Sequence, residues 1–156
     1  MISDDVLWYS DVLVCDIDDT LIYGEMVDFM DLMWRIFKSP LLAKLLSRLQ
    51  AKFKLYRVKY KVAELIVQFL INKKEVYLLT ARGFDTSTTD MINDIIPVDG
   101  PLKIISLGSY NPSRDKYEWM QSKFTNKDIL FIDDNLKTRL KCMELHKVNA
   151  IHPGDV

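Results

Sequence analysis

Five short runs of apolar, β-forming residues recur along the chain, and segments with helical periodicity separate them. The runs are continuous rather than alternating, which is typical of strands covered on both faces, as in a parallel sheet. They lie at residues 12–17, 76–79, 104–107, 129–132 and, more weakly, 148–151. The helical patterns occupy residues 26–37, 40–72, 85–95, 113–124 and 136–146. This order predicts an α/β fold, a Rossmann-like three-layer sandwich around a central parallel sheet.

Composition is that of one ordinary globular domain, which we expect to span residues 1–156. Hydrophobic residues make up 49% of the chain and charged residues 28%, which excludes the disordered and fibrous classes. No run approaches the ~20 apolar residues of a membrane span, and the first residues lack the pattern of a secretory signal. Two cysteines, Cys15 and Cys142, are too few for a disulfide framework. We therefore expect reduced thiols and a cytoplasmic protein.

Polar side chains close three of the predicted strands. Asp16 and Asp18 follow the first run, Thr80 ends the second, and Asp133 and Asp134 follow the fourth. The carboxyl ends of parallel strands form the usual ligand site of such sheets. Clustered carboxylates repel one another unless a cation or a proton balances them. A solvated acidic turn or a helix cap would explain the first cluster alone, so two clusters favour a metal site.

These motifs resemble those of the haloacid dehalogenase superfamily, in its phosphatase branch. The segment Asp-Ile-Asp-Asp-Thr-Leu at residues 16–21 matches the first motif of that family, and Thr80 matches the second. Lys116, near the start of a predicted helix, is the best candidate for the third, and the pair Asp133–Asp134 matches the fourth. The resemblance spans residues 12–135 and adds the expectation of a phosphatase.

The resemblance also implies a role for each carboxylate. Asp16 would be the nucleophile and a ligand of Mg²⁺, a hard cation that prefers oxygen ligands. Asp18 would be the general acid and base, and its backbone carbonyl would bind the metal. Asp133 would be the distal metal ligand with Asp134 in support, or Asp134 would be the ligand itself; both choices stay open.

Two further residues would bind the transferring phosphoryl group. Thr80 would donate its hydroxyl to the phosphoryl oxygens, and Lys116 would neutralise charge on the nucleophile and the phosphate. Simpler interpretations remain for each, because Thr80 could be a helix N-cap and Lys116 an ordinary surface lysine. Lys103 is the rival lysine, but it stands at the entrance of a predicted strand, which is the wrong end for the site.

An unusual distribution of charge marks one segment. Residues 35–63 contain nine Lys or Arg and no Asp or Glu, although the net charge of the chain is −1. We interpret residues 26–60 as a small helical cap or basic arm inserted in the domain. Apolar residues from Leu42 to Tyr60 recur at helical spacing. The basic stripe consists of Lys44, Arg48, Lys52 and Lys59.

Three interpretations of this stripe stay open: a solvated face, an electrostatic guide for an anionic substrate or nucleic acid, and a membrane-surface helix. The sequence as a whole predicts a Mg²⁺-dependent phosphatase that forms an aspartyl-phosphate. Nucleotides and nucleic-acid end phosphates are among its candidate substrates. A phosphotransferase is an alternative, since the same intermediate serves any acceptor. A catalytically silent binding module for nucleic acid or membrane is another. The oligomeric state is open.

Overall fold

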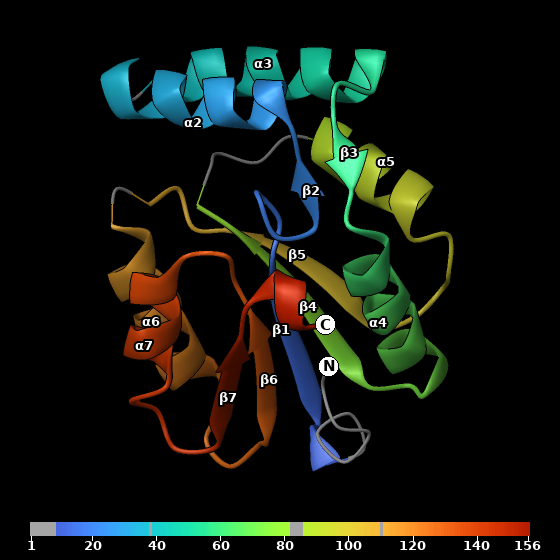
Figure 1. Cartoon of the computed structure of the whole chain (residues 1–156), viewed down its shortest axis with the longest axis vertical. Helices are drawn as coiled ribbons and strands as arrows, with labels where there is room; N and C mark the ends of the chain where they lie inside the picture. Colours follow the sequence, from blue (N-terminus) through green and yellow to red (C-terminus); the bar gives the residue numbers. More distant parts are fainter. Residues whose placement is uncertain (1–8, 38, 82–85, 110) are drawn as a thin grey trace.

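The computed structural model describes residues 9–37, 39–81, 86–109 and 111–156. Its centre is a five-stranded sheet in the order β5-β4-β1-β6-β7, in which every neighbouring pair is parallel (Figure 1). The strands are β1 (Val12–Asp16), β4 (Glu75–Thr80), β5 (Leu102–Ser106), β6 (Ile129–Ile132) and β7 (Val148–Ile151). The predicted strands are therefore confirmed, with boundaries shifted by one or two residues.

Helices cover both faces of this sheet, which confirms the three-layer sandwich. On one side lie α4 (Tyr60–Ile71) and α5 (Thr86–Ile95), and on the other lie α6 (Pro112–Lys123) and α7 (Leu136–Cys142) (Figure 1). Successive residues of a strand point to opposite faces. Leu13 and Cys15 accordingly pack under α4 and α5, whereas Val12 and Val14 pack under α6 and α7.

One predicted helix is shorter in the structure, and the start of another is not tested. The helix expected at 136–146 ends at Cys142, because the chain then turns and Lys147 takes a left-handed φ of 66° before β7. The start expected at residue 85 lies outside the described residues, and α5 is described from Thr86. A 3₁₀ turn, η1 (Pro153–Asp155), follows β7. Both cysteines are free and buried, as expected.

The long helical pattern at 40–72, in which the sequence does not locate a break, consists of two helices. Here α3 (Pro40–Phe53) begins after its N-cap residue Ser39, whose Oγ accepts a hydrogen bond from the backbone N–H of Leu42 at 3.4 Å. It ends where Lys54 adopts a left-handed φ of 49°. A short strand, β3 (Arg57–Val58), then leads into α4.

The segment before α3 lies beyond the carboxyl edge of the sheet, together with α3 and β3 (Figure 1). It contains β2 (Ile22–Tyr23), which pairs antiparallel with β3, and α2 (Glu25–Phe37), which lies alongside α3 (Figure 1). The two-residue strands were not predicted, since strands this short show no periodicity. Whether this segment works as a cap stays a prediction.

The break after Phe53 corrects the predicted basic stripe. Arg48 and Lys52 are exposed on α3, and the side chain of Lys44 lies outside the described part. Lys59 belongs elsewhere, because it is the N-cap residue of α4, beyond β3. The stripe therefore does not continue to residue 60. Among the described residues, no helix combines the length and the apolar character needed to cross a bilayer.

Candidate active site

Three predicted site residues meet at the carboxyl edge of the sheet. Asp16 is the last residue of β1, Thr80 is the last residue of β4, and Asp133 directly follows β6. Because β1 lies between β4 and β6, their ends are neighbours, with Asp16 paired in register with Leu79. All three side chains are buried. The parallel topology therefore brings together residues that are more than a hundred positions apart.

Lys116 joins two of these carboxylates from the helix layer. It lies on α6, and its Nζ is 2.6 Å from both Oδ1 of Asp16 and Oδ2 of Asp133. The side chain is buried and is not the ordinary surface lysine that the sequence left possible. Lys103, the rival, lies on β5 with its Nζ 5.4 Å from the ring centroid of Tyr77. Of the two lysines, only Lys116 contacts Asp16.

Charge in this buried cluster is not balanced. Burial raises the pKa of Asp16 well above its ordinary value, Lys116 opposes that shift, and the charge of Asp133 adds to it. Burial alone would lower the pKa of Lys116, but Asp16 and Asp133 outweigh it and raise that pKa. One ammonium therefore faces two buried carboxylates. Since Asp134 adds a third carboxylate beside them, a further cation is electrostatically favoured.

Thr20 connects the first and last motifs. Its Oγ1 lies 3.5 Å from Oδ2 of Asp16 and 3.4 Å from Oδ1 of Asp134, and it accepts a hydrogen bond from the backbone N–H of Asp134 at 3.0 Å. The side chain is fully buried. Thr20 thus holds the two carboxylates in a fixed relation, a role that sequence reasoning did not assign to it individually.

Asp133 and Asp134 have different surroundings. Both oxygens of Asp133 are engaged: Lys116 donates to Oδ2, and the backbone N–H of Asn135 donates to Oδ1 at 2.8 Å. Asp134 is only partly buried. Arg139, one turn into α7, donates from Nη1 to the backbone carbonyls of both aspartates, each at 2.6 Å. Arg139 therefore fixes the main chain of the pair and leaves its carboxylates to other partners.

The carboxylates are arranged closely enough to hold one metal ion. Asp16, Asp133 and Asp134 each offer an oxygen, and these three atoms lie within 4.8 Å of one another. An all-oxygen, carboxylate-rich set of this kind suits Mg²⁺. Asp18, the fourth residue expected at the metal, directs its side chain elsewhere, since its Oδ2 accepts a hydrogen bond from Thr80 Oγ1 at 3.3 Å. That contact is compatible with the expectation that only the backbone carbonyl of Asp18 is a ligand.

The inserted segment contributes a cation that sequence reasoning placed elsewhere. The Nζ of Lys59 donates to the backbone carbonyl of Asp19, and its backbone N–H donates to the carbonyl of Leu21 at 2.9 Å. Burial raises the pKa of Asp19 to about 6, the charge of Asp134 adds to this, and Lys59 opposes it. Lys59 therefore lies beside the carboxylates. Locating it from sequence would have required the break between α3 and α4.

The loop after β5 supports the helix that carries Lys116. The backbone N–H of Ser109 donates to the carbonyl of Ala81 at 2.8 Å, which attaches the loop just after Thr80. The buried hydroxyl of Ser109 donates to Oδ2 of Asp115 and accepts from the backbone N–H of Asn111. These contacts fix the first turn of α6 and thereby the position of Lys116.

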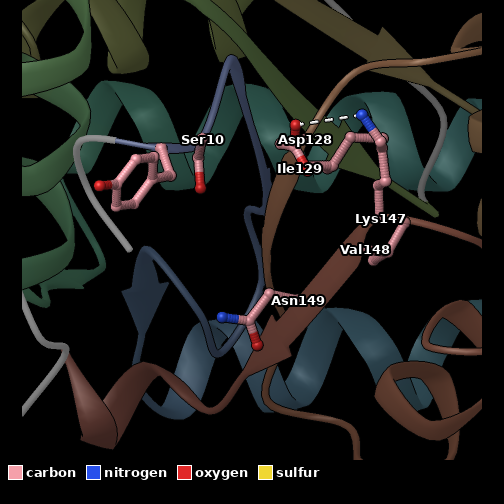
Figure 2. A pocket seen from close by; sticks show the side chains of 7 residues that line it. Ser10, Asp128, Ile129, Lys147, Val148 and Asn149 are labelled. Carbon is pink, nitrogen blue, oxygen red and sulfur yellow. Dashed lines mark hydrogen bonds and ion pairs between the residues drawn. The ribbon is translucent and has the colours of Figure 1, made fainter. Parts of the chain in front are cut away.

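A hollow of about 300 Å³ lies at the opposite edge of the sheet. Figure 2 shows its lining, where Lys147 and Asp128 are 3.4 Å apart beside Ser10 and Asn149. These residues stand at the amino ends of β1, β6 and β7. The hollow is therefore separate from the carboxylate cluster, and we assign it no part in the chemistry.

Searches for relatives were negative: no protein-family model matches the chain, and no curated protein matches it.

Proposed function

We propose that the protein is a Mg²⁺-dependent phosphatase, similar to those of the haloacid dehalogenase superfamily, that acts through an aspartyl-phosphate on Asp16. One observation carries the proposal: the ammonium of Lys116 lies 2.6 Å from both Asp16 and Asp133 at the edge where Thr80 and Asp134 also lie. An ion pair between Lys116 and Asp16 that served only the fold would not require Asp133, Asp134 and the Thr80 hydroxyl at the same strand ends. Phosphoryl transfer uses all of these groups.

In the first half of the reaction, the carboxylate of Asp16 attacks phosphorus and the bond to the leaving oxygen breaks. The carboxyl group of Asp18 gives its proton to that oxygen, so the alcohol departs neutral. Lys116 limits the repulsion between the Asp16 carboxylate and the phosphate, and the Thr80 hydroxyl donates to a phosphoryl oxygen. The Thr80 hydroxyl donates to Oδ2 of Asp18 in the structure, and it would exchange this partner for the phosphoryl oxygen when substrate binds.

In the second half, water attacks the phosphorus of the aspartyl-phosphate. Asp18, now a carboxylate, takes the proton from that water, and the bond between phosphorus and Asp16 breaks. Inorganic phosphate leaves and Asp16 returns to its starting state. Asp18 is only partly buried, which lets water reach it, whereas Asp16 is buried and protected from side reactions.

Asp16 and Asp134 are the residues we propose as the carboxylate ligands of Mg²⁺, with the backbone carbonyl of Asp18. Asp134 is preferred to Asp133, because both oxygens of Asp133 accept short hydrogen bonds, from Lys116 at 2.6 Å and from the Asn135 backbone at 2.8 Å. Thr20 makes only longer contacts, at 3.5 Å to Oδ2 of Asp16 and at 3.4 Å to Oδ1 of Asp134, which the metal could replace. When bound, Mg²⁺ supplies positive charge that screens the nucleophile from the phosphate and stabilises the charge that develops in the transition state. Asp133 would then orient Lys116 and not bind the metal directly.

The experiment is a turnover assay with a generic aryl phosphate in the presence of Mg²⁺. Wild-type protein should release phosphate, excess chelator should stop it, and Asp16→Asn should abolish it, because an amide is not a nucleophile here. Asp90→Asn is the matched control, since Asp90 is exposed on α5, outside the cluster. A wild-type protein without turnover on any phosphomonoester or phosphoryl acceptor would favour the silent binding module instead.

The substrate class is a phosphomonoester. A screen should therefore compare phosphorylated metabolites with nucleotides and with 3′- or 5′-phosphorylated oligonucleotides. Release of phosphate to water distinguishes a phosphatase from a phosphotransferase, which would need an added acceptor. We place this activity in the cytoplasm, where the buried thiols of Cys15 and Cys142 would stay reduced.

A further inference from the structure

Large apolar side chains are exposed at the turn between α2 and α3. Five of them flank this turn, with exposed fractions from 53% to 80%, and we call them the apolar tip: Leu32, Ile36, Phe37, Leu41 and Leu45. Figure 1 shows α2 and α3 side by side across the carboxyl end of the sheet, with their turn at one extremity of the pair. Single exposed leucines are common on soluble proteins, but five around one turn form a patch that marks an interaction site.

Positive charge adjoins the apolar tip. The helix α3 contains Lys44, Arg48 and Lys52 without any acidic residue, and Arg48 and Lys52 are exposed. Residues 35–63 carry nine basic residues and no acidic ones. The acidic residues in the first turn of α2, Glu25 and Asp28, lie at the other end of that helix, away from the turn. Leu41, Leu45, Arg48 and Lys52 follow one another at helical spacing, so the two basic residues continue the exposed face of α3 away from the apolar tip.

Each simpler partner explains only half of this surface. A nucleic acid would account for the basic residues through its phosphates, but not for exposed aliphatic side chains such as Ile36 and Leu41. A protein partner would account for the apolar tip and for Arg48, but six of the nine basic residues in 35–63 are lysines, in which interfaces between proteins are depleted. Apolar side chains next to a basic surface fit the boundary between the headgroups and acyl chains of an anionic bilayer.

We propose that the α2–α3 pair binds the surface of an anionic lipid bilayer. The apolar tip enters the interfacial region, and Arg48 and Lys52 contact the lipid phosphates. The protein lies on the membrane and does not span it. This inference does not rest on the proposed phosphatase activity, because binding can be measured without turnover. The carboxylate cluster and the α2–α3 pair lie at the same end of the sheet, so binding would bring the cluster toward the bilayer.

Co-sedimentation of the full chain with lipid vesicles tests the proposal. We expect binding to vesicles that mix phosphatidylcholine with phosphatidylserine, and weaker binding to phosphatidylcholine alone. The triple variant Ile36→Ser, Leu41→Ser, Leu45→Ser should lower the partition coefficient by about tenfold or more, because apolar burial in the bilayer is lost. The double variant Arg48→Gln, Lys52→Gln should lower it roughly tenfold on the anionic vesicles only.

Matched controls separate these effects from a general change of surface. Leu136→Ser, Leu140→Ser and Met143→Ser replace three comparably exposed apolar residues on and just after α7 (60%, 58% and 51% exposed) and should leave binding unchanged. Lys73→Gln with Lys137→Gln removes two exposed charges elsewhere and should have little effect. Far-UV circular dichroism and Tm identify any variant that fails to fold, and a second tip variant, Leu41→Ser alone, then replaces the triple one.

Three results would overturn the proposal. The first is wild-type protein that stays in the supernatant with anionic vesicles. The second is equal loss of binding in the tip variant and in its α7 control. The third is a protein that binds an oligonucleotide but not vesicles, which would assign the surface to nucleic acid. Self-association that the tip variant abolishes, again without vesicle binding, would assign the surface to a second copy of the chain.

Discussion

The Nζ of Lys116 lies 2.6 Å from Oδ1 of Asp16, although 100 residues separate them in the sequence. Both side chains are buried, and a second carboxylate, Asp133, lies at the same distance from the ammonium. An arrangement with this charge is costly unless each charged group has partners. The contact therefore makes direct predictions about stability as well as about chemistry.

Removal of the ammonium should destabilise the fold. Lys116→Met leaves Asp16 and Asp133 buried without their cation, which should lower the free energy of unfolding by about 3–5 kcal/mol. Urea titration measures the effect, and added Mg²⁺ should restore part of the loss, because the metal supplies the missing charge. Lys103→Met is the control and should change stability little, since Lys103 is exposed. Equal stability of the two variants would refute a structural role of the Lys116 cluster.

Asp18, Asp133 and Asp134 should differ in their response to Mg²⁺. Asp18→Asn should lose on the order of 10²–10⁴-fold in kcat, the usual contribution of a positioned acid and base, with the Mg²⁺ requirement unchanged. Asp134→Asn should instead need more Mg²⁺, and high Mg²⁺ should recover part of its activity. Asp133→Asn should lose stability, as Lys116→Met does, more than it changes the Mg²⁺ requirement, since the oxygens of Asp133 contact Lys116 and Asn135. Activity measured against Mg²⁺ concentration separates the three, and identical curves would contradict these roles.

Lys59 should behave differently from the other basic residues of its segment. Its Nζ donates to the backbone carbonyl of Asp19 beside the carboxylates, whereas Arg48 and Lys52 are exposed on α3. Lys59→Gln should therefore alter kcat/KM for a small aryl phosphate, and Arg48→Gln with Lys52→Gln should not. A variant that combines Lys44→Gln, Arg48→Gln, Lys52→Gln and Lys59→Gln should then change kcat/KM only as much as Lys59→Gln alone. If both variants leave the small substrate unaffected, Lys59 has no role at the site.

Stability should also depend on pH through a residue far from the site. A hydrogen bond from Lys127 and a second one from Tyr77 lower the pKa of Glu75 below its ordinary value of 4.5. A lowered pKa in the folded state contributes stability above the unfolded pKa, and this contribution is lost as the pH falls through the folded pKa. Glu75→Gln should therefore have a lower Tm than wild type at neutral pH, and the difference should vanish in acid. A difference independent of pH would exclude this ionic cause.

The parallel sheet and its polar strand ends could be predicted because their signals are local. Continuous apolar runs such as Ile129–Ile132 indicate strands buried on both faces, and parallel connections then bring their carboxyl ends to one edge. Lys116 could be proposed only by resemblance, because a lone lysine on a helix does not indicate which way its side chain points. The structure adds the reason, namely the α6 position that directs Nζ between two strands.

The break in the long helical pattern could not be predicted for a different reason. The segment from Pro40 to Ile71 contains no glycine, and its single proline, Pro40, starts the helical pattern and does not interrupt it. The helix ends at Phe53 because Lys54 takes a left-handed conformation and β3 pairs with β2, which is a tertiary contact. The position of Lys59 depends on that break. The predicted basic stripe was wrong at Lys59, because it assumed a helix that continued past Phe53. Long-range pairing of two-residue strands has no counterpart in local periodicity.

The mass of the protein during turnover tests whether Asp16 forms an aspartyl-phosphate. Wild-type protein mixed with excess aryl phosphate and Mg²⁺, then quenched in acid, should carry one phosphoryl group, and peptide mapping should place it on Asp16. Asp18→Asn should accumulate more of this species, because its breakdown needs the base, while Asp16→Asn should carry none. Turnover with no phosphoryl group on any of these proteins, or with the group on another residue, would contradict an aspartyl-phosphate mechanism at Asp16.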